Sequence, residues 1–360
     1  MPQSIDIADR VSGLLIGTAV GDAIGLPRES MSRRRAVRLF GGPPLEHRLI
    51  FGRGMVSDDT EHACMTAASL LEHPDDPERF GRALAGRLRT WFLSLSAGIG
   101  MATARACLKL WLGWPPQRSG VWSAGNGPAM RAPVIGAFLY DRPDQMRDAV
   151  RMSTRLTHTD PKAEEGAWVV ATAASVALRH MPETLSAEAF IEVVLDKING
   201  PELKQRLAKA LELLKRNQPA IDYIRTWKTD DGVSGYINET VPAAIYCWLK
   251  HRGDVRRTVE EVVMLGGDAD TTGAIAGALA GATSGRTAIP RDWIDGLWEW
   301  PRTVTWIDRL AERLMRRMNC RNSAERIDPP NVSWCLIPIR NVLFLSIVLG
   351  HGLRRLLPPY

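Results

Sequence analysis

The stretch SDDTEHACM, which begins at Ser57, places two adjacent carboxylates at the start of an expected helix. Asp58 and Asp59 are flanked by the hydroxyl groups of Ser57 and Thr60. One acidic or hydroxyl side chain is enough to cap a helix, so capping explains only part of this pattern. Magnesium and manganese prefer oxygen-only ligand sets of this kind. The stretch therefore leaves two interpretations open, a helix cap and a divalent-cation site.

A second oxygen-rich stretch, LGGDADTTGAIAGALAGA, begins at Leu265. Its two glycines permit an unusual backbone, and Asp268, Asp270 and Thr271 follow at the start of an alanine- and glycine-rich helix that can pack closely against its neighbours. A capped core helix is the simpler alternative. Four carboxylates that converge without cations would repel one another. If the two stretches meet, a site for two divalent cations, Mg²⁺ or Mn²⁺, is the simplest interpretation.

The elements that position these side chains are predicted to be helices. Apolar residues recur at helical spacing over most of the chain, for example at 167–178 and 203–214, and alternating runs typical of strands are scarce. Pro77, Pro143 and Pro290 each stand where a helix is expected to begin. We therefore expect an all-α fold, with one large helical domain over residues 1–318 and a basic, apolar and helical tail over residues 319–360.

Composition narrows the class of protein. The chain has 360 residues, 45% of them hydrophobic, which is enough for a sizeable core. The net charge of +6 is a mild excess that does not by itself indicate nucleic acid as a partner. The five cysteines never form a CxxC pair, which is typical of reduced thiols rather than of disulfides or a zinc site. Because the N-terminus also lacks a signal-peptide pattern, we expect a cytoplasmic protein.

The C-terminal tail allows two interpretations. Its most apolar run, 342–349, is far shorter than the roughly 20 residues that span a bilayer, and Pro338 and Arg340 are expected to interrupt a longer helix. The favoured interpretation is a helix that packs on the catalytic domain or on a partner subunit. The other is peripheral membrane contact, in which Arg340, Arg354 and Arg355 touch anionic lipid. Both a monomer and a small homo-oligomer stay open.

Six segments, in order along the chain, resemble the ADP-ribosylglycohydrolase family, which includes the glycohydrolase that reactivates dinitrogenase reductase and the animal ADP-ribosyl-acceptor hydrolases. They lie within residues 13–282 and read GLLIGTAVGDAIGLPRE, SDDTEHACM, GNGPAMRAP, THTDPKAEEGA, SGYINETVPAA and GGDADTTGAIAGALAGA. The resemblance implies a single all-helical domain with a dinuclear metal site. It also implies a metal-dependent hydrolase in which water attacks the anomeric carbon of ADP-ribose and releases the acceptor.

The resemblance assigns roles to individual residues. For the metal site, the family pattern places one ion on Ser57, Asp58, Asp59 and Asp270, and a second on Asp268, Asp270 and Thr271, with Asp270 bridging. Glu29 matches the active-site glutamate, which is expected to orient water or transfer a proton. Without the resemblance, Glu29 would be interpreted as an exposed loop residue. The catalytic candidates are therefore Glu29, Asp58, Asp59 and Asp270.

The substrate-binding candidates come from three further segments. In WSAGNGPAMR, Gly125 and Gly127 free the backbone to approach a ligand, and Ser123 and Asn126 can donate hydrogen bonds to a pyrophosphate, although Asn-Gly more often marks a plain turn. The resemblance places His158 in the ADP-ribose pocket as a neutral imidazole and Tyr236 opposite the adenosine. A lone histidine is otherwise more often structural. Asp22 could fix a loop or contact the ligand.

Two departures from the family pattern affect the substrate. Arginine-directed bacterial members often carry Asp-Ile-Gly where this chain has Gly98, which weakens the case for an arginine-linked substrate. Glu61 replaces the more frequent glutamine and could be a ligand, a base behind the ligands, or half of a capping box. The acceptor therefore stays open among protein side chains, a modified nucleic acid and an ADP-ribose metabolite.

Two other functions are alternatives to the hydrolase. A non-catalytic ADP-ribose-binding or crystallin-like structural member would be expected to lack metal ligands, yet Asp58, Asp59, Asp268 and Asp270 are all present. An unrelated metal-dependent phosphohydrolase is disfavoured because its ordinary motifs are not evident.

Overall fold

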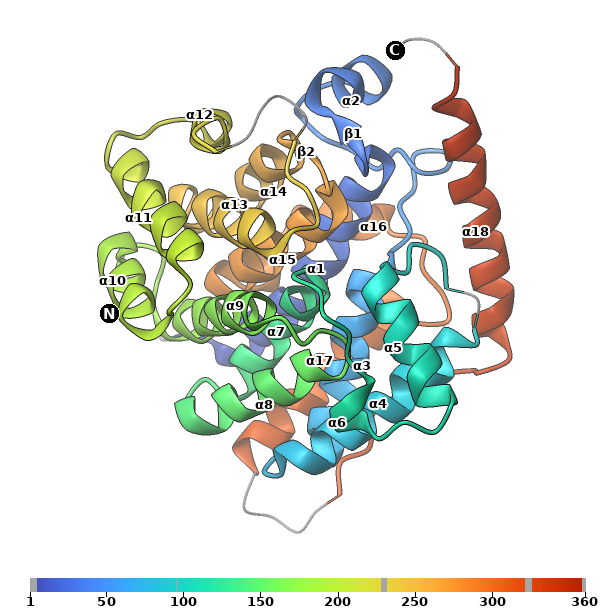
Figure 1. Cartoon of the computed structure of the whole chain (residues 1–360). Coiled ribbons are helices and arrows are strands. Elements are labelled where there is room, and N and C mark those ends of the chain that lie inside the picture. Colours follow the sequence, from blue (N-terminus) through green and yellow to red (C-terminus); the bar gives the residue numbers. More distant parts are fainter. Residues whose placement is uncertain (1–4, 95, 228–231, 321–325, 358–360) are drawn as a thin grey trace.

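The computed structural model describes residues 5–94, 96–227, 232–320 and 326–357, and nearly all of their regular structure is helical (Figure 1). The predicted all-α fold is confirmed. The α-helices are α1 (Ile7–Gly25), α2 (Arg33–Phe40), α3 (Asp58–Glu72), α4 (Pro77–Phe92), α5 (Met101–Trp111), α6 (Pro116–Ser119), α7 (Gly127–Phe138), α8 (Pro143–Arg155), α9 (Pro161–Arg179), α10 (Ala187–Lys197), α11 (Pro201–Lys215), α12 (Ala220–Ile224), α13 (Ile237–Lys250), α14 (Val255–Val263), α15 (Ala269–Ser284), α16 (Arg291–Gly296), α17 (Val304–Asn319) and α18 (Leu336–Arg354). Two 3₁₀ turns (Leu26–Arg28 and Arg286–Ala288) and two short strands, β1 (Met31–Ser32) and β2 (Gly266–Gly267), complete the list.

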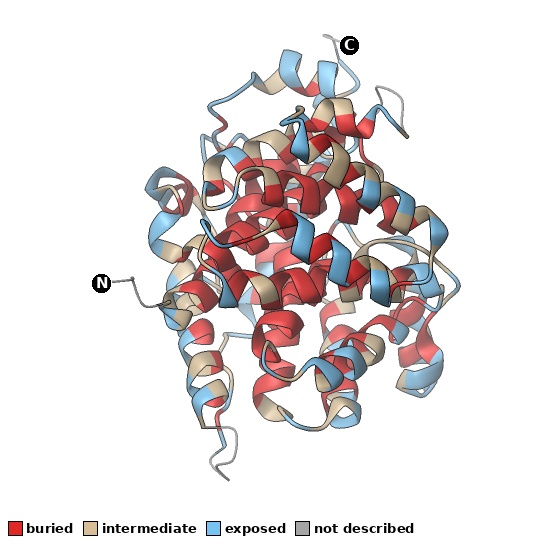
Figure 2. Ribbon diagram, turned by 90° about the vertical axis from the view of Figure 1, so that its left-hand side faces the viewer, coloured by how far each residue is buried: buried red, intermediate tan, exposed pale blue. Residues whose placement is uncertain are grey.

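The helix starts follow the local chemistry that the sequence indicated. Pro77 and Pro143 are the first residues of α4 and α8, where a missing backbone N–H costs no helical hydrogen bond, and Pro290 directly precedes α16. The periodic stretches 167–178 and 203–214 lie within α9 and α11. Buried residues fill the interior of the helical assembly, and exposed residues cover its outside (Figure 2).

The centre of the fold is an antiparallel pair of helices, α1 and α15, that meet backbone to backbone. Glycines four residues apart on α1 face small residues four residues apart on α15: Gly13 faces Gly281, Gly17 faces Gly277, and Gly21 faces Gly273. A Cβ atom added to Gly17 would lie 2.2 Å from the carbonyl oxygen of Gly277. The predicted close packing of the alanine- and glycine-rich helix is confirmed.

This antiparallel pairing brings two chemically important chain segments together. The C-terminal end of α1, which leads to Glu29, lies beside the N-terminal end of α15, which carries Asp268 and Asp270. Strand β1 follows Glu29 and pairs antiparallel with β2, which immediately precedes Asp268. Gly266 and Gly267 adopt φ angles of +78° and +80°, the unusual backbone that the double glycine was expected to provide.

The tail forms α18, which packs along the outside of the helical domain (Figure 1). Among the described helices it alone is long and apolar enough to cross a bilayer by length and composition, with a mean hydropathy of 1.6. The expected interruption at Pro338 and Arg340 was wrong. Pro338 lies in the first turn, where its missing N–H is tolerated, and Arg340 is paired with a carboxylate.

Arg340 points into the protein rather than toward solvent, so the expectation that it contacts lipid was wrong as well. Its guanidinium forms a two-pronged ion pair with Glu299, at 2.9 and 2.7 Å, and also donates to the carbonyl oxygen of Val56. Glu299 in turn accepts a hydrogen bond from the backbone N–H of Val56. The neighbouring Asn341 donates to Ser94, just beyond α4. Arg340 and Asn341 of α18 thus anchor two segments, the one that precedes α3 and the one that follows α4.

We expect Arg340→Lys to lower the free energy of unfolding by about 2 kcal/mol, because a lysine keeps the charge but cannot form the two parallel bonds to Glu299 and the bond to Val56. Urea unfolding monitored by circular dichroism measures this change. Arg354→Lys, an exposed position on the same helix, is the control and should stay within about 0.5 kcal/mol of the wild type. Equal stability of the two variants would show that the fork geometry contributes nothing.

Candidate functional site

A cavity of about 650 Å³ opens where several helices begin. Its walls are the first turns of α3, α5, α7 and α15, the segment before α13, and the turn that carries Glu29. Of the residues predicted for the site, the cavity is lined by Glu29, Asp58, Ser123, Gly125, Asn126, Gly127, His158, Asp268, Asp270 and Thr271. Ser57 and Asp59 lie buried behind this lining, and Tyr236 is not part of it.

The start of α3 combines the two interpretations that its sequence allowed. Ser57 is the helix cap, and its hydroxyl oxygen accepts from the backbone N–H of Asp59 at 3.2 Å. Asp22 of α1 accepts from the backbone N–H groups of Ser57 and Thr60 and from the Thr60 hydroxyl. Burial raises the pKa of Asp22 to about 7. Asp22 therefore fixes the loop, and because Ser57 and Asp22 satisfy the helix start, Asp58 is left to face the cavity.

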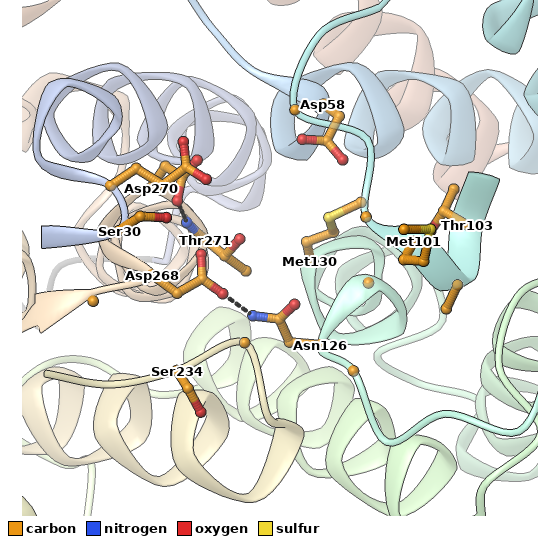
Figure 3. Close-up of a pocket in the computed structure, with 18 of the residues that line it drawn as sticks. Ser30, Asp58, Met101, Thr103, Asn126, Met130, Ser234, Asp268, Asp270 and Thr271 are labelled. Atoms are coloured by element: carbon orange, nitrogen blue, oxygen red, sulfur yellow. Dashed lines mark hydrogen bonds between the residues drawn. The ribbon is translucent and has the colours of Figure 1, made fainter. Parts of the chain in front are cut away.

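The start of α15 supplies the opposite side of the cavity. Figure 3 shows Asp58 across the cavity from Asp268, Asp270 and Thr271. The Thr271 hydroxyl lies 3.1 Å from Oδ2 of Asp59, which links the first turn of α15 to that of α3. The predicted convergence of the two acidic stretches is confirmed.

These carboxyl groups raise one another's pKa values. Burial is the largest cause for each, and it raises the pKa values of Asp58, Asp59 and Asp270 well above the usual range. Neighbouring negative charges raise them further: Asp22 acts on Asp58, Asp58 acts on Asp59, and Glu29 acts on Asp270. These carboxyl groups therefore resist being ionised together.

Glu29 is partly buried beside this group. Burial raises its pKa, the charge of Asp268 raises it further, and the guanidinium of Arg355, just past α18, lowers it. Arg355 also donates to the carbonyl oxygen of Pro27, two residues before Glu29. The interpretation of Glu29 as an exposed loop residue is therefore wrong.

The oxygen donors at the acidic end of the cavity suit divalent cations, although they are not arranged as a complete set of metal ligands. Within residues 5–94, 96–227, 232–320 and 326–357, no group of three or more His, Cys, Asp or Glu side chains stands ready to hold a metal ion. The donors are all oxygens, and Oδ1 of Asp59 is buried without a hydrogen-bond partner. A cation between α3 and α15 would relieve both the unpaired oxygen and the mutual repulsion of the carboxylates.

Asn126 has a different partner from the one predicted. Its amide nitrogen donates to Asp268 at 2.6 Å and to the hydroxyl of Thr240 at 3.0 Å (Figure 3). Both bonds of the Asn126 amide nitrogen are thus made within the protein, where they orient the Asp268 carboxylate. Sequence reasoning missed Thr240, since no local signal connects α13 to the start of α7.

His158 lies in the cavity as a neutral imidazole. Burial, with the charge of Arg131 nearby, lowers its pKa to about 3. A Cβ atom added to Gly125 would lie 3.0 Å from Nε2 of His158, and one added to Gly127 would lie 3.0 Å from Cε1. These glycines therefore make room for the imidazole ring. Arg131, which the sequence did not single out, is buried and donates to Thr157, the residue before His158.

The wall opposite the carboxylates is formed by helix starts. α5 and α7 begin at the cavity, and neither of their cap residues makes a side-chain hydrogen bond to the first turn. Free N–H groups and the positive end of the helix dipole favour anions at such positions. Tyr236 is the cap residue of α13, and its hydroxyl contacts Glu202 and Lys162 instead of the cavity.

Gly98 and Glu61, the two residues that depart from the family pattern, lie in different surroundings. Gly98 lines the cavity with φ at +83°, and a Cβ atom added there would lie 3.5 Å from Oδ1 of Asp58. A side chain at this position would therefore enter the acidic end. Glu61 points away from the cavity, bound by Trp91 at 2.7 Å and by Arg302 at 2.8 Å. The interpretations of Glu61 as a metal ligand or as half of a capping box were wrong.

A family model described as ADP-ribosylglycohydrolase matches residues 3–323. The chain belongs to this family. This match confirms the family that the six segments indicated. The members of this family are glycosidase-type hydrolases, which is the class of enzyme that was predicted.

Similar proteins cover most of the chain. An uncharacterized protein of Archaeoglobus fulgidus is 32% identical over 85% of this chain and 96% of its own length. The ADP-ribosylhydrolase ARH3 of Xenopus tropicalis is 29% identical, covering 87% of this chain and 98% of that protein. The ADP-ribosyl-[dinitrogen reductase] glycohydrolase of Rhodospirillum rubrum is 27% identical over 86% of this chain and 94% of its own length.

A solved structure supports the same fold. A chain described as part of an ADP-ribosylglycohydrolase-related protein complex superposes with a TM-score of 0.66 at 29% identity, covering 87% of this chain and 99% of that chain. The family model ends at residue 323, so α18 lies beyond it.

Proposed function

We propose that this chain is a metal-dependent hydrolase that removes ADP-ribose from a modified acceptor. One observation carries the proposal: a single cavity has a group of carboxylates at one end and, at the other, the starts of α5 and α7, which have no side-chain caps. ADP-ribose has the matching polarity, since its diphosphate suits the helix starts and its terminal ribose suits cations held by carboxylates. The volume of the cavity, about 650 Å³, lies within the range of pockets for ligands of this size.

The residues of α3 and α15 have the first role in this proposal. Asp58, Asp59, Asp268 and Asp270, with Ser57 and Thr271, would hold two divalent cations, Mg²⁺ or Mn²⁺. Bound cations would supply Lewis-acid chemistry for the ribose hydroxyls and for a water molecule. Asp22, which fixes the Ser57–Thr60 turn, and Asn126, which binds Asp268, keep these carboxylates in place.

Glu29 is proposed to act on the water. It lies beside Asp268 at the acidic end, and the opposing influences of burial and of Arg355 on its pKa suit a group that exchanges a proton. The water oxygen would form a bond to the anomeric carbon as the bond to the acceptor breaks, and Glu29 would take a proton from the water and pass it to the departing acceptor. The positive charge that develops on the ribose would be stabilised by the surrounding carboxylates. His158, as a neutral imidazole, can donate or accept a hydrogen bond from the bound ligand.

The acceptor and the compartment complete the proposal. Position 98 carries no side chain beside Asp58, which argues against a carboxylate-bound guanidinium there. We therefore place arginine-linked substrates behind serine-linked, nucleic-acid-linked and acylated ADP-ribose. All five cysteines are free, which supports a reducing, cytoplasmic location.

The test is release of free ADP-ribose from arginine-, serine- and nucleic-acid-linked substrates and from acylated ADP-ribose, with Mg²⁺, with Mn²⁺ and with a chelator. Release from at least one substrate that stops with the chelator is the expected result, and the panel then names the acceptor. Tight ADP-ribose binding without turnover of any substrate would overturn the proposal in favour of a binding module.

A further inference from the structure

Helix α18 is apolar on both its inward and its outward side, whereas an ordinary surface helix is polar outward. Its inward side buries Ile337 and Phe344 and carries two polar anchors, Arg340 bound to Glu299 and Asn341 bound to Ser94. Its outward side is apolar at helical spacing: Ile339, Val342, Leu345, Leu349 and Leu353 are 59%, 50%, 37%, 58% and 66% exposed. No charged residue interrupts the outward side before Arg354. We call this outward side, residues 336–353, the α18 apolar face.

A basic cluster borders one end of this face. Helix α2 carries four arginines within eight residues and packs on the last turns of α18, where Arg35 donates to the carbonyl oxygen of Arg355 and Phe40 stacks on His351 with ring centroids 6.1 Å apart. Figure 1 shows α2 beside the C-terminal end of α18. Among these arginines, Arg33, Arg34 and Arg38 are exposed, as is Arg354.

The charge of both segments has one sign. No aspartate or glutamate occurs from residue 329 to the end of the chain, and none occurs between Glu29 and Glu46. The surface that the apolar face and the basic cluster form together is therefore complementary to a partner that is apolar and anionic at once. A bilayer with anionic headgroups has this combination, since acyl chains accept the leucines and headgroups accept the arginines.

We propose that the α18 apolar face and the adjoining arginines of α2 dock the enzyme on the surface of an anionic membrane. The helix lies in the interface and does not span the bilayer, because insertion would pull Arg340 away from the buried Glu299 and leave that carboxylate without its partner.

A second copy of the chain fits this surface less well. Parallel pairing of two α18 helices would bring the two basic clusters together. Antiparallel pairing would set each cluster against the start of the partner's α18, in a segment without acidic residues. Repulsion between like charges therefore opposes parallel pairing, and antiparallel pairing gains no ion pair for the arginines. The lipid surface avoids this conflict.

The experiment is co-sedimentation of the full chain with vesicles of phosphatidylcholine alone and of phosphatidylcholine mixed with phosphatidylglycerol, at low and high salt. Binding only to the mixed vesicles, weakened by salt, is expected. Leu345→Glu with Leu349→Glu should lower the bound fraction at least tenfold. Arg33→Gln with Arg354→Gln should lower it about tenfold.

The control variant is Val193→Glu, which adds one negative charge in place of an apolar side chain at a position on α10 that is 56% exposed. It should bind vesicles like the wild type, and all variants should keep the wild-type melting temperature because the changed side chains are exposed. Absence of binding by the wild type, or equal binding by the Leu345/Leu349 variant, would overturn the proposal. A wild-type dimer in light scattering that the same variant splits into monomers, without vesicle binding, would assign the face to a second copy.

Discussion

An Asp58→Asn, Asp270→Asn double variant is expected to lose ADP-ribose release by about a thousandfold or more while folding at least as stably as the wild type in the absence of metal. Asparagine keeps the shape of each side chain but lacks the negative charge that attracts a divalent cation. The two carboxyls come from different helices, α3 and α15, so the variant weakens both halves of the proposed site.

Stability is expected to move in the opposite direction from activity. Because burial and mutual repulsion raise the pKa values of Asp58 and Asp270, these groups oppose folding above the pKa of an unfolded aspartate, near pH 4. Removing them should leave the melting temperature in chelator unchanged or higher at pH 7. Saturating Mg²⁺ or Mn²⁺ should raise the melting temperature of the wild type but not that of the variant.

Activity and melting temperature, measured together, distinguish a variant that has lost its chemistry from one that has lost its fold. Asp196→Asn, whose carboxylate is exposed on α10, is the matched control and should change neither activity nor the response to metal. A double variant that keeps activity within tenfold of the wild type, or that is still stabilised by the cations, would show that these carboxylates do not hold the metal.

Local patterns in the sequence were sufficient for the helices and for the acidic end of the site. Proline at a first turn, glycine at four-residue spacing and paired carboxylates at a helix start each act within a few residues, so their consequences can be read from the chain. Asp58 and Asp270 meet in one cavity because the glycine-lined contact of α1 with α15 permits few other arrangements of the central helices.

Side-chain partners that are distant in sequence could not be predicted in this way. Glu61 was a candidate ligand until the fold placed Arg302 and Trp91 around its carboxylate. Asn126 was assigned to a phosphate, but tertiary structure brings Asp268 within 2.6 Å of its amide. A pattern specifies which groups can bond, and the packing of whole helices decides which of them meet.

The pairing of α1 with α15 leads to the second large prediction. Gly277→Val is expected to lower the free energy of unfolding by at least 3 kcal/mol, because a Cβ atom at this position would lie 2.3 Å from the carbonyl oxygen of Gly17. Neither atom can move alone, since both belong to helix backbones in the centre of the protein. Relief requires the two helices to separate, which opens voids along the rest of their contact.

The damage should extend to the site as well as to stability. Separation of α1 from α15 is expected to shift Glu29 relative to Asp268 and Asp270, because Glu29 follows the end of α1 and the two aspartates lie at the start of α15. We therefore expect the folded fraction of Gly277→Val to show weaker stabilisation by Mg²⁺ than the wild type. Urea unfolding with and without the cation measures both effects.

Gly86→Ala is the matched control for this experiment. Gly86 lies inside α4, and an added Cβ atom there would meet nothing within 4 Å, so alanine should raise the free energy of unfolding by about 0.5–1 kcal/mol. The two glycine substitutions should thus act in opposite directions. If Gly277→Val were as stable as the wild type, the backbone contact of α1 with α15 would not be what holds the two ends of the site together.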